Sequence, residues 1–153
     1  MKLSENFSLN EFTKSQTATR HNIDNTPSMT EILNLTSLCE SVLQPVRNNF
    51  QKPMIISSGF RCKELNAKIG GSATSQHVVG QAADIEVLGT SNLELSDWIH
   101  HNLNYDQLIL EFYNEKEGPH SGWVHVSFNN ESNRHAYKEA YKNEQGQTRY
   151  RLR

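Results

Sequence analysis

The sequence contains only two cysteines, Cys39 and Cys62, and no Cys-x-x-Cys pair. A network of disulfide bonds and a thiolate metal site are therefore not expected, and both residues are predicted to be free thiols. No apolar run approaches the roughly 18 residues of a membrane-spanning helix, and residues 1–8 lack the apolar core of a signal peptide. We expect a protein that is synthesised in the cytoplasm without a signal peptide and has no membrane span.

The chain also lacks a strong excess of charge of either sign, because its formal net charge at pH 7 is -2. Nucleic acid is therefore not expected to be its main partner. Internal repeats and low-complexity tracts are absent as well. With 153 residues the chain is long enough for one compact domain with a real core, and we expect a monomer.

Apolar and polar residues alternate in three segments of the chain, at 82–87, 106–112 and 122–128. Such alternation is typical of strands that are buried on one face. Asp84 and Glu111 then lie on the opposite, polar faces of their strands. The residues predicted to face the core are Ala83, Ile85 and Val87 in the first segment and Leu108, Leu110 and Phe112 in the second.

Histidine and aspartate occupy three positions that suit a metal site. His77 precedes Asp84 by seven residues, and alternation places His125 on the polar face of the third segment. Two histidines, one aspartate and an open fourth position describe a catalytic zinc site better than a structural one. If the segments pair in one sheet, these residues and Glu111 converge above it. The alternative for Asp84 is a buried ion pair, because an aspartate inside a strand is costly to bury alone.

Two segments carry the Ser-x-x-Glu signal that opens helices, beginning at Ser28 and at Ser91. Pro45 is predicted to bend or end the first helix in its last turn, and the second is predicted to stop near 102–104. A short helix is expected over 62–69, before two glycines. These elements predict a single α+β domain, with a mainly antiparallel sheet that carries the zinc site on one face and helices packed on the other.

Several short strings in the chain match one known family in their order. They are Phe7-Ser8-Leu9-Asn10-Glu11-Phe12, Asn25-Thr26-Pro27, Leu43-Gln44-Pro45-Val46-Arg47, Ser57-Ser58-Gly59-Phe60-Arg61, Gly70-Gly71-Ser72, Ser75-Gln76-His77 and Gly122-Trp123-Val124-His125. With these strings the chain resembles the zinc D-alanyl-D-alanine carboxypeptidase and L-alanyl-D-glutamate endopeptidase family. The resemblance implies a hedgehog-like fold, and many relatives are phage lysis or bacterial cell-wall enzymes.

By this resemblance, His77, Asp84 and His125 bind zinc, which would polarise the scissile carbonyl and lower the pKa of a water molecule. A general base must take the proton of that water. Many family members place an acidic residue three positions before the last histidine, where this chain has Gly122. Strand alternation instead puts Glu111 on the site face, so we predict Glu111 as the base. The alternative is a solvated glutamate at a strand end.

The resemblance also implies residues that contact the substrate. Arg61 ends a Ser-Gly-Phe-Arg string that is similar to the family's Ser-Gly-Tyr-Arg, whose arginine faces the substrate. A guanidinium suits the carboxylates of peptidoglycan stem peptides, and the alternative is a surface salt bridge. Ser75 and Gln76, beside the first ligand, are assigned to substrate binding. His120 stands where some relatives have a histidine that stabilises the tetrahedral intermediate, and the alternative is an exposed loop residue.

The clear resemblance ends near residue 128, so we predict a zinc peptidase domain over 1–128 and a basic C-terminal extension over 129–153. Residues 134–153 contain six Lys or Arg and two Glu. We expect a solvated helix near 135–143 and then a loose or edge-strand terminus, and the alternative is a tail that contacts anionic wall polymers.

Two functions remain open. The first is a zinc peptidase that hydrolyses stem or cross-bridge peptides of peptidoglycan, as an endopeptidase or a carboxypeptidase, after release by a lysis system or as part of a phage particle. The second is an inactive zinc-containing module on the same fold that binds the cell wall or has a structural role.

Overall fold

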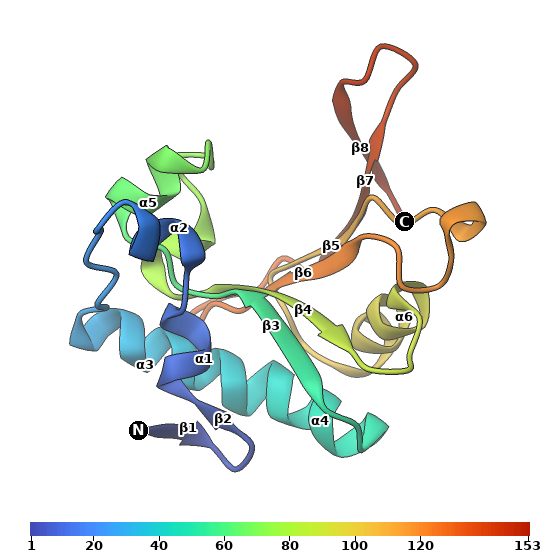
Figure 1. The fold of residues 1–153 in the computed structure, drawn as a ribbon. Coiled ribbons are helices and arrows are strands. Elements are labelled where there is room, and N and C mark those ends of the chain that lie inside the picture. The colour runs from blue at the N-terminus through green and yellow to red at the C-terminus, as the bar shows by residue number, and fades with distance from the viewer.

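The computed structural model describes residues 1–153 and contains a six-stranded sheet in the order β3-β4-β6-β5-β7-β8 (Figure 1). Neighbouring strands are antiparallel except β5 and β7, which are parallel. This is the predicted α+β fold with a mainly antiparallel sheet. The strands of the sheet are β3 (Met54–Ser58), β4 (Ala82–Val87), β5 (Gln107–Glu111), β6 (Trp123–Ser127), β7 (Ala136–Lys142) and β8 (Thr148–Leu152).

The remaining elements are short, apart from α6 and the long helical run over residues 29–50, which consists of α3, η1 and α4. A two-stranded ribbon, β1 (Lys2–Ser4) and β2 (Phe7–Ser8), leads into the helices at the N-terminus. The helices are α1 (Leu9–Thr13), α2 (Gln16–Arg20), α3 (Met29–Leu38), η1 (Cys39–Leu43), α4 (Gln44–Phe50), α5 (Lys63–Lys68), η2 (Gln76–Val79), α6 (Asn92–Asn102) and η3 (Glu115–Glu117). None of them is both long and apolar enough to cross a membrane.

One hydrophobic core joins the sheet to the long helical run and to α6. The alternation predicted for β4 is confirmed, because Ala83, Ile85 and Val87 are fully buried whereas Asp84 and Glu86 are only partly buried. The other fully buried members of this core include Leu35, Val42, Leu95, Ile99, Leu108, Leu110, Val124 and Val126. Burial of one sheet face leaves the opposite face free to carry polar side chains.

The helix that begins after Ser28 has the predicted capping box with Glu31, but Pro45 does not end it. A π-helical segment, η1, lies directly before the proline and connects α3 to α4 without a break. Proline cannot donate a hydrogen bond, and its ring clashes with the carbonyl four residues earlier in an α-helix. The wider turn removes this conflict, so the helix continues to Phe50.

Two expectations about the second half of the chain are wrong. The segment 135–143 forms strand β7 and not a helix, because it pairs with the edge of β5 over five residues, and this pairing outweighs the local helical preference of its Lys, Glu and Ala residues. Phe112 is not in the core: its φ of 55° takes it out of the alternation of β5, and its ring contacts Trp123 instead. The predicted edge strand at the C-terminus is β8, which forms a hairpin with β7.

Candidate metal centre

The three predicted metal ligands lie together on the polar face of the sheet. Asp84 on β4 and His125 on β6 are direct cross-strand partners, so their side chains project from the same face. His77 reaches them from η2, just before β4. Its Nε2 lies 3.4 Å from Oδ1 of Asp84, and Nδ1 of His125 lies 3.1 Å from the same oxygen. All three ligand atoms lie within 4.8 Å of one another.

The orientation of His77 is fixed by its backbone surroundings. Its Nδ1 lies 2.7 Å from the carbonyl oxygen of Gly59, which can only accept, so Nδ1–H is the donor and Nε2 keeps its lone pair. Ser75 Oγ accepts a hydrogen bond from the backbone N–H of His77 at 3.2 Å. Burial lowers the pKa of His77, which is 2% exposed, and so favours the neutral imidazole. A neutral ring held by a backbone carbonyl is the usual form of a metal-binding histidine.

Asp84 is ionised despite its burial. Burial alone works against the charge, but the hydrogen bond from Nδ1 of His125 and the contact with the ring of His77 outweigh it and hold the pKa of Asp84 below its usual range. Two imidazole nitrogens and one carboxylate oxygen thus face a common point, and no thiolate is among them. This donor set fits zinc with a fourth position open to the cleft.

The ligands lie at the bottom of an open cleft of about 480 Å³. Glu111, at the end of β5, also lines this cleft, as predicted from the strand alternation. Burial raises the pKa of Glu111 to about 7, with His125 opposing the shift and Asp84 adding to it. A carboxyl group that exchanges its proton near neutral pH is suited to general acid–base catalysis.

The absence of an acidic side chain at Gly122 has a steric cause. A Cβ atom at this position would lie 1.8 Å from the backbone oxygen of Glu111, and the φ of Gly122 is +67°, in the region that favours glycine. The chain around Glu111 and Phe112 therefore fills the space that a side chain at 122 would need. Glu111 is the one glutamate that the structure places in the cleft.

Arg61 lies between the cleft and a neighbouring cavity that is lined by β3 and α5. Its backbone N–H donates to the carbonyl of His77, and its buried Nε has no partner. Burial lowers the pKa of Arg61, whereas the charge of Asp84 opposes this shift. The surface salt bridge weighed as the alternative for Arg61 is not present. Arg61 lines the cleft without an anionic partner in the protein, so its guanidinium group is available for an anionic ligand.

Ser75 and Gln76 line the same cleft, but both have partners within the protein. Ser75 holds the backbone of His77, as described above. The Nε2 of Gln76 donates to Asp106 at 2.9 Å and to Gln81 at 3.2 Å. Only the carbonyl oxygen of the Gln76 side chain remains free for a ligand.

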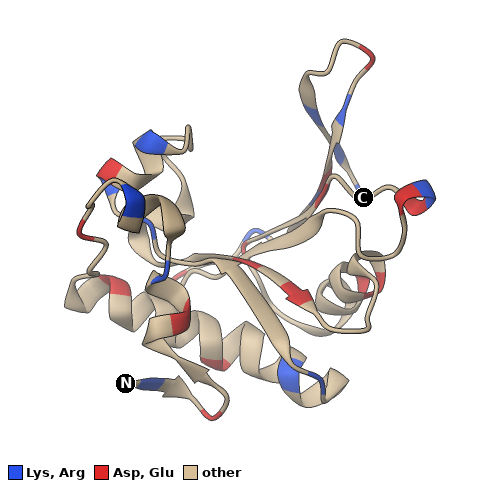
Figure 2. Cartoon of the chain, viewed as in Figure 1, with Lys and Arg blue, Asp and Glu red and all other residues tan.

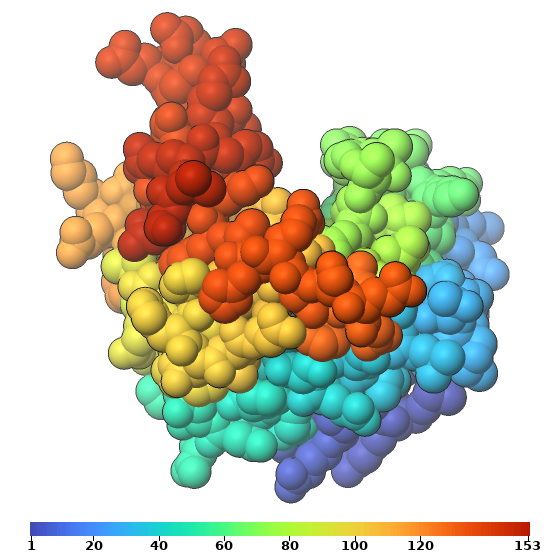
Figure 3. Space-filling view, turned by 180° about the vertical axis from the view of Figure 1, so that it is seen from behind, coloured from blue at the N-terminus to red at the C-terminus, as the bar shows by residue number.

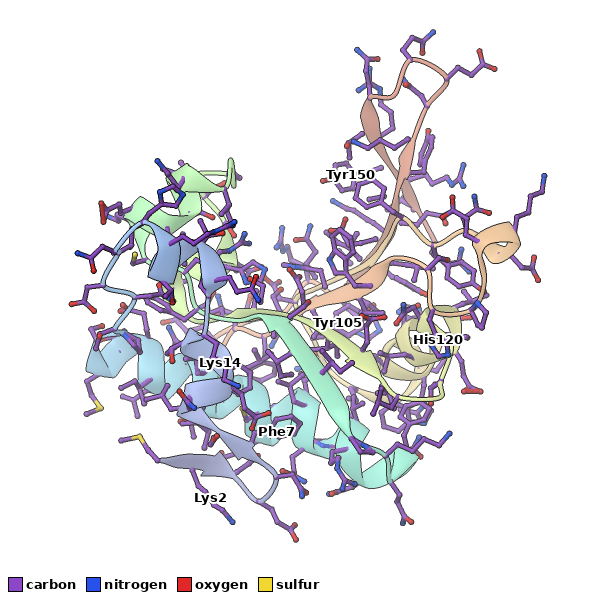
Figure 4. The ribbon with its side chains drawn as sticks, viewed as in Figure 1. Lys2, Phe7, Lys14, Tyr105, His120 and Tyr150 are labelled. Atoms are coloured by element: carbon purple, nitrogen blue, oxygen red, sulfur yellow. The ribbon has the colours of Figure 1, made fainter.

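The structure does not bring His120 to the site. This residue is exposed in the loop after η3, is not among the residues that line the cleft, and lies near the α6 side of the molecule (Figure 4). The geometry matches the alternative of an exposed loop residue, and we assign His120 no role in the chemistry.

Sequence reasoning missed three residues at the cleft. Asp106 is 5% exposed and binds Arg134, and both Arg134 and Tyr150 line the cleft from the last 20 residues of the chain. The only local signal was Asp106 itself, an acidic residue at the start of a strand pattern. Its partner is 28 residues away, and nothing in the spacing indicates the pair.

Comparison with known proteins agrees with this geometry. A family model described as Peptidase M15 matches residues 5–127, which include all three candidate ligands and Glu111. No curated protein sequence matches the chain.

Proposed function

Because the chain belongs to the Peptidase M15 family, we propose that it is a zinc-dependent peptidase that hydrolyses stem or cross-bridge peptides of bacterial peptidoglycan. The observation that carries this proposal is the convergence of His77, Asp84 and His125 at the bottom of an open cleft, with Glu111 beside them. A buried structural zinc site would have a fourth protein ligand and no access to the cleft.

When bound, zinc would supply a Lewis acid that polarises the scissile carbonyl and lowers the pKa of a water molecule. Glu111 takes the proton of this water as general base and delivers it to the leaving amine. In the metal-free protein burial raises the pKa of Glu111 to about 7, so that the carboxylate and the carboxylic acid are both accessible near neutral pH. Asp84 is ionised in the metal-free protein, since its contacts with the two histidine rings hold its pKa below the usual range, and in this form it would serve as the carboxylate ligand.

Arg61 orients the substrate. Its guanidinium group lines the cleft and has no anionic partner in the protein, and a carboxylate or the carbonyl oxygen of a stem peptide fits such a donor group. The backbone N–H of Arg61 donates a hydrogen bond to the carbonyl of His77, and this contact holds the backbones of the two residues next to each other. We propose that the enzyme meets its substrate on the cell wall, after release by a lysis system or on a phage particle.

Digestion of purified peptidoglycan, followed by mass spectrometry of the released fragments, tests the proposal. We expect new stem-peptide fragments with the unchanged protein and none with Glu111→Gln, which keeps the shape of the side chain but cannot accept the proton. Glu115→Gln is the matched control, because Glu115 lies exposed in η3 outside the cleft. Zinc binding without fragments from the unchanged protein would instead support a binding module on the same fold.

A further inference from the structure

Arg134 is held against the cleft by a nearly buried aspartate. The backbone N–H and Nε of Arg134 both donate to Oδ1 of Asp106 at 2.9 Å, and Nη2 donates to Oδ2 at 3.1 Å. These hydrogen bonds keep the pKa of Asp106 below its usual range, so both Asp106 and Arg134 are charged. A side-on pair of this kind fixes the plane and direction of a guanidinium.

The same pair is connected to the metal centre. Gln76, the neighbour of His77, donates to Oδ2 of Asp106 at 2.9 Å, so Arg134 and η2 share one carboxylate. The guanidinium uses one N–H of Nε and one of Nη2 for Asp106, and the remaining three of its five N–H groups have no partner in the protein. Arg134 lines the cleft, and its side chain is 61% exposed.

The C-terminal hairpin completes this wall of the cleft. Tyr150 on β8 lines the cleft together with Arg134 and Glu111, and Figure 4 shows it facing the hollow between the hairpin and α5. Figure 3 shows the same hollow from behind, between the hairpin and the segment around α5 and η2. Arg134 and Tyr150 both lie beyond residue 127, where the match to the family model ends.

The C-terminal segment that carries Arg134 and the hairpin is rich in positive charge. Residues 134–153 contain six Lys or Arg against two Glu, and Figure 2 shows basic residues along the hairpin strands. On the other side of the ligands, Arg61 also lines the cleft and forms no ion pair within the protein. The cleft therefore has guanidinium groups from two separate segments, and each can donate hydrogen bonds to a carboxylate.

We propose that Arg134, positioned by Asp106, binds a carboxylate of the substrate peptide next to the reacting bond, and that Tyr150 packs against the same part of the peptide. The enzyme then prefers stem peptides with a free carboxyl group at this position over peptides in which the group is a carboxamide. This inference rests on the proposed function, and it names the substrate chemistry that the same site selects.

The proposal can be tested with pairs of synthetic stem peptides. The two peptides of a pair differ in one carboxyl group, which is free in one peptide and converted to a carboxamide in the other. Each carboxyl group of the peptide is converted in turn, and kcat/KM is measured for every peptide. At one carboxyl position, we expect Arg134→Gln to lower kcat/KM for the free-carboxyl peptide about 10- to 100-fold, because charge-assisted hydrogen bonds have about this strength. The kcat/KM for the matching carboxamide peptide should stay nearly unchanged. Arg149→Gln is the matched control, since Arg149 is exposed on the hairpin and does not line the cleft.

A purely structural role of Arg134 would give a different result. If the residue only anchors the hairpin, Arg134→Gln lowers kcat/KM equally for both peptides, and an unchanged ratio at every carboxyl position overturns the proposal. If the unchanged protein cleaves no peptide, the proposed function fails. The inference about Arg134 is then tested by calorimetry, which measures how strongly the same peptides bind to the unchanged protein and to Arg134→Gln. Weaker binding of the free-carboxyl peptide alone in Arg134→Gln supports it, and equal binding overturns it.

Discussion

Nδ1 of His77 donates a hydrogen bond to the carbonyl oxygen of Gly59, 2.7 Å away, and this contact turns Nε2 of the ring toward Asp84. Gly59 directly follows β3, and His77 is in η2, so the contact joins two segments that are 18 residues apart. The first ligand is thus oriented by the backbone and not by another side chain. Backbone geometry near Gly59 should therefore control zinc affinity.

Gly59→Ala is expected to weaken zinc binding. The new Cβ would lie 2.7 Å from the backbone of Phe12, so the chain at 59 must shift and move the carbonyl away from His77. Overpacking of this kind costs about 1–3 kcal/mol of folding stability. Competition with a chelator measures the zinc affinity, and urea unfolding measures the stability.

Gly146→Ala is the matched control for that experiment. Gly146 lies at the tip of the hairpin, where a Cβ would meet open space. Its φ of +74° makes alanine unfavourable there, so some stability is lost, but zinc affinity should not change. Equal zinc affinity in both variants would contradict the role given to Gly59.

Glu111→Gln should change how the stability of the metal-free protein depends on pH. The pKa of Glu111 is raised from 4.5 to about 7 in the folded protein, chiefly by burial. As pH rises through this window, the unfolded chain releases a proton that the folded chain retains, so the unchanged protein loses stability. Glutamine does not titrate. The variant should therefore gain stability relative to the unchanged protein between pH 5 and pH 8.

Urea unfolding of both metal-free proteins at these two pH values measures the effect. Saturating zinc should reduce the difference between them, because a cation beside Glu111 favours its ionised form. A difference in the free energy of unfolding that stays constant with pH would show that Glu111 is not buried as the structure has it.

Restoring an acidic residue at 122 should not restore a base there. In Gly122→Glu the Cβ overlaps the backbone oxygen of Glu111, and the positive φ adds strain. We expect a loss of about 3 kcal/mol or more in folding stability and no activity gain in a Glu111→Gln background. Thermal unfolding and peptide turnover check this, and a stable, active double variant would contradict the steric explanation.

His120→Ala should leave peptide turnover within about twofold of the unchanged protein, because His120 is exposed outside the cleft. Loss of a group that stabilises the oxyanion usually lowers kcat about 100- to 1000-fold. The two outcomes are far enough apart for a single steady-state assay. A loss of the larger size would mean that the loop after η3 moves into the cleft during turnover.

Local patterns in the sequence were enough to predict which side chains share one face of the sheet. Strand alternation has a period of two, so it predicted that Asp84 and Glu111 lie on the polar faces of their strands. In the structure, the pairing of β4 with β6 places Asp84 directly opposite His125. The capping box formed by Ser28 and Glu31 and the N-cap at Ser91 are likewise local contacts. The strand alternation and the helix caps depend on residues that are close in sequence, whereas the pairing of β4 with β6 does not.

Contacts between distant residues were not predictable in the same way. The carbonyl of Gly59 is a backbone group, and no residue type marks it as the partner of His77. The pair of Asp106 and Arg134 depends on the path of the chain after β6. The parallel pairing of β7 with β5 likewise has no local signal, and it places the hairpin with Tyr150 beside the cleft.

The central claim is that His77, Asp84 and His125 hold one zinc ion that peptide hydrolysis requires. The most direct test measures the zinc content of the purified protein and, on the same sample, the release of stem-peptide fragments from peptidoglycan. His125→Ala removes a ligand, whereas His101→Ala removes an exposed histidine at the end of α6 and serves as the control. We predict one zinc ion per chain and fragment release for the unchanged protein and for His101→Ala, and neither for His125→Ala. Fragment release by His125→Ala without bound zinc would contradict the claim.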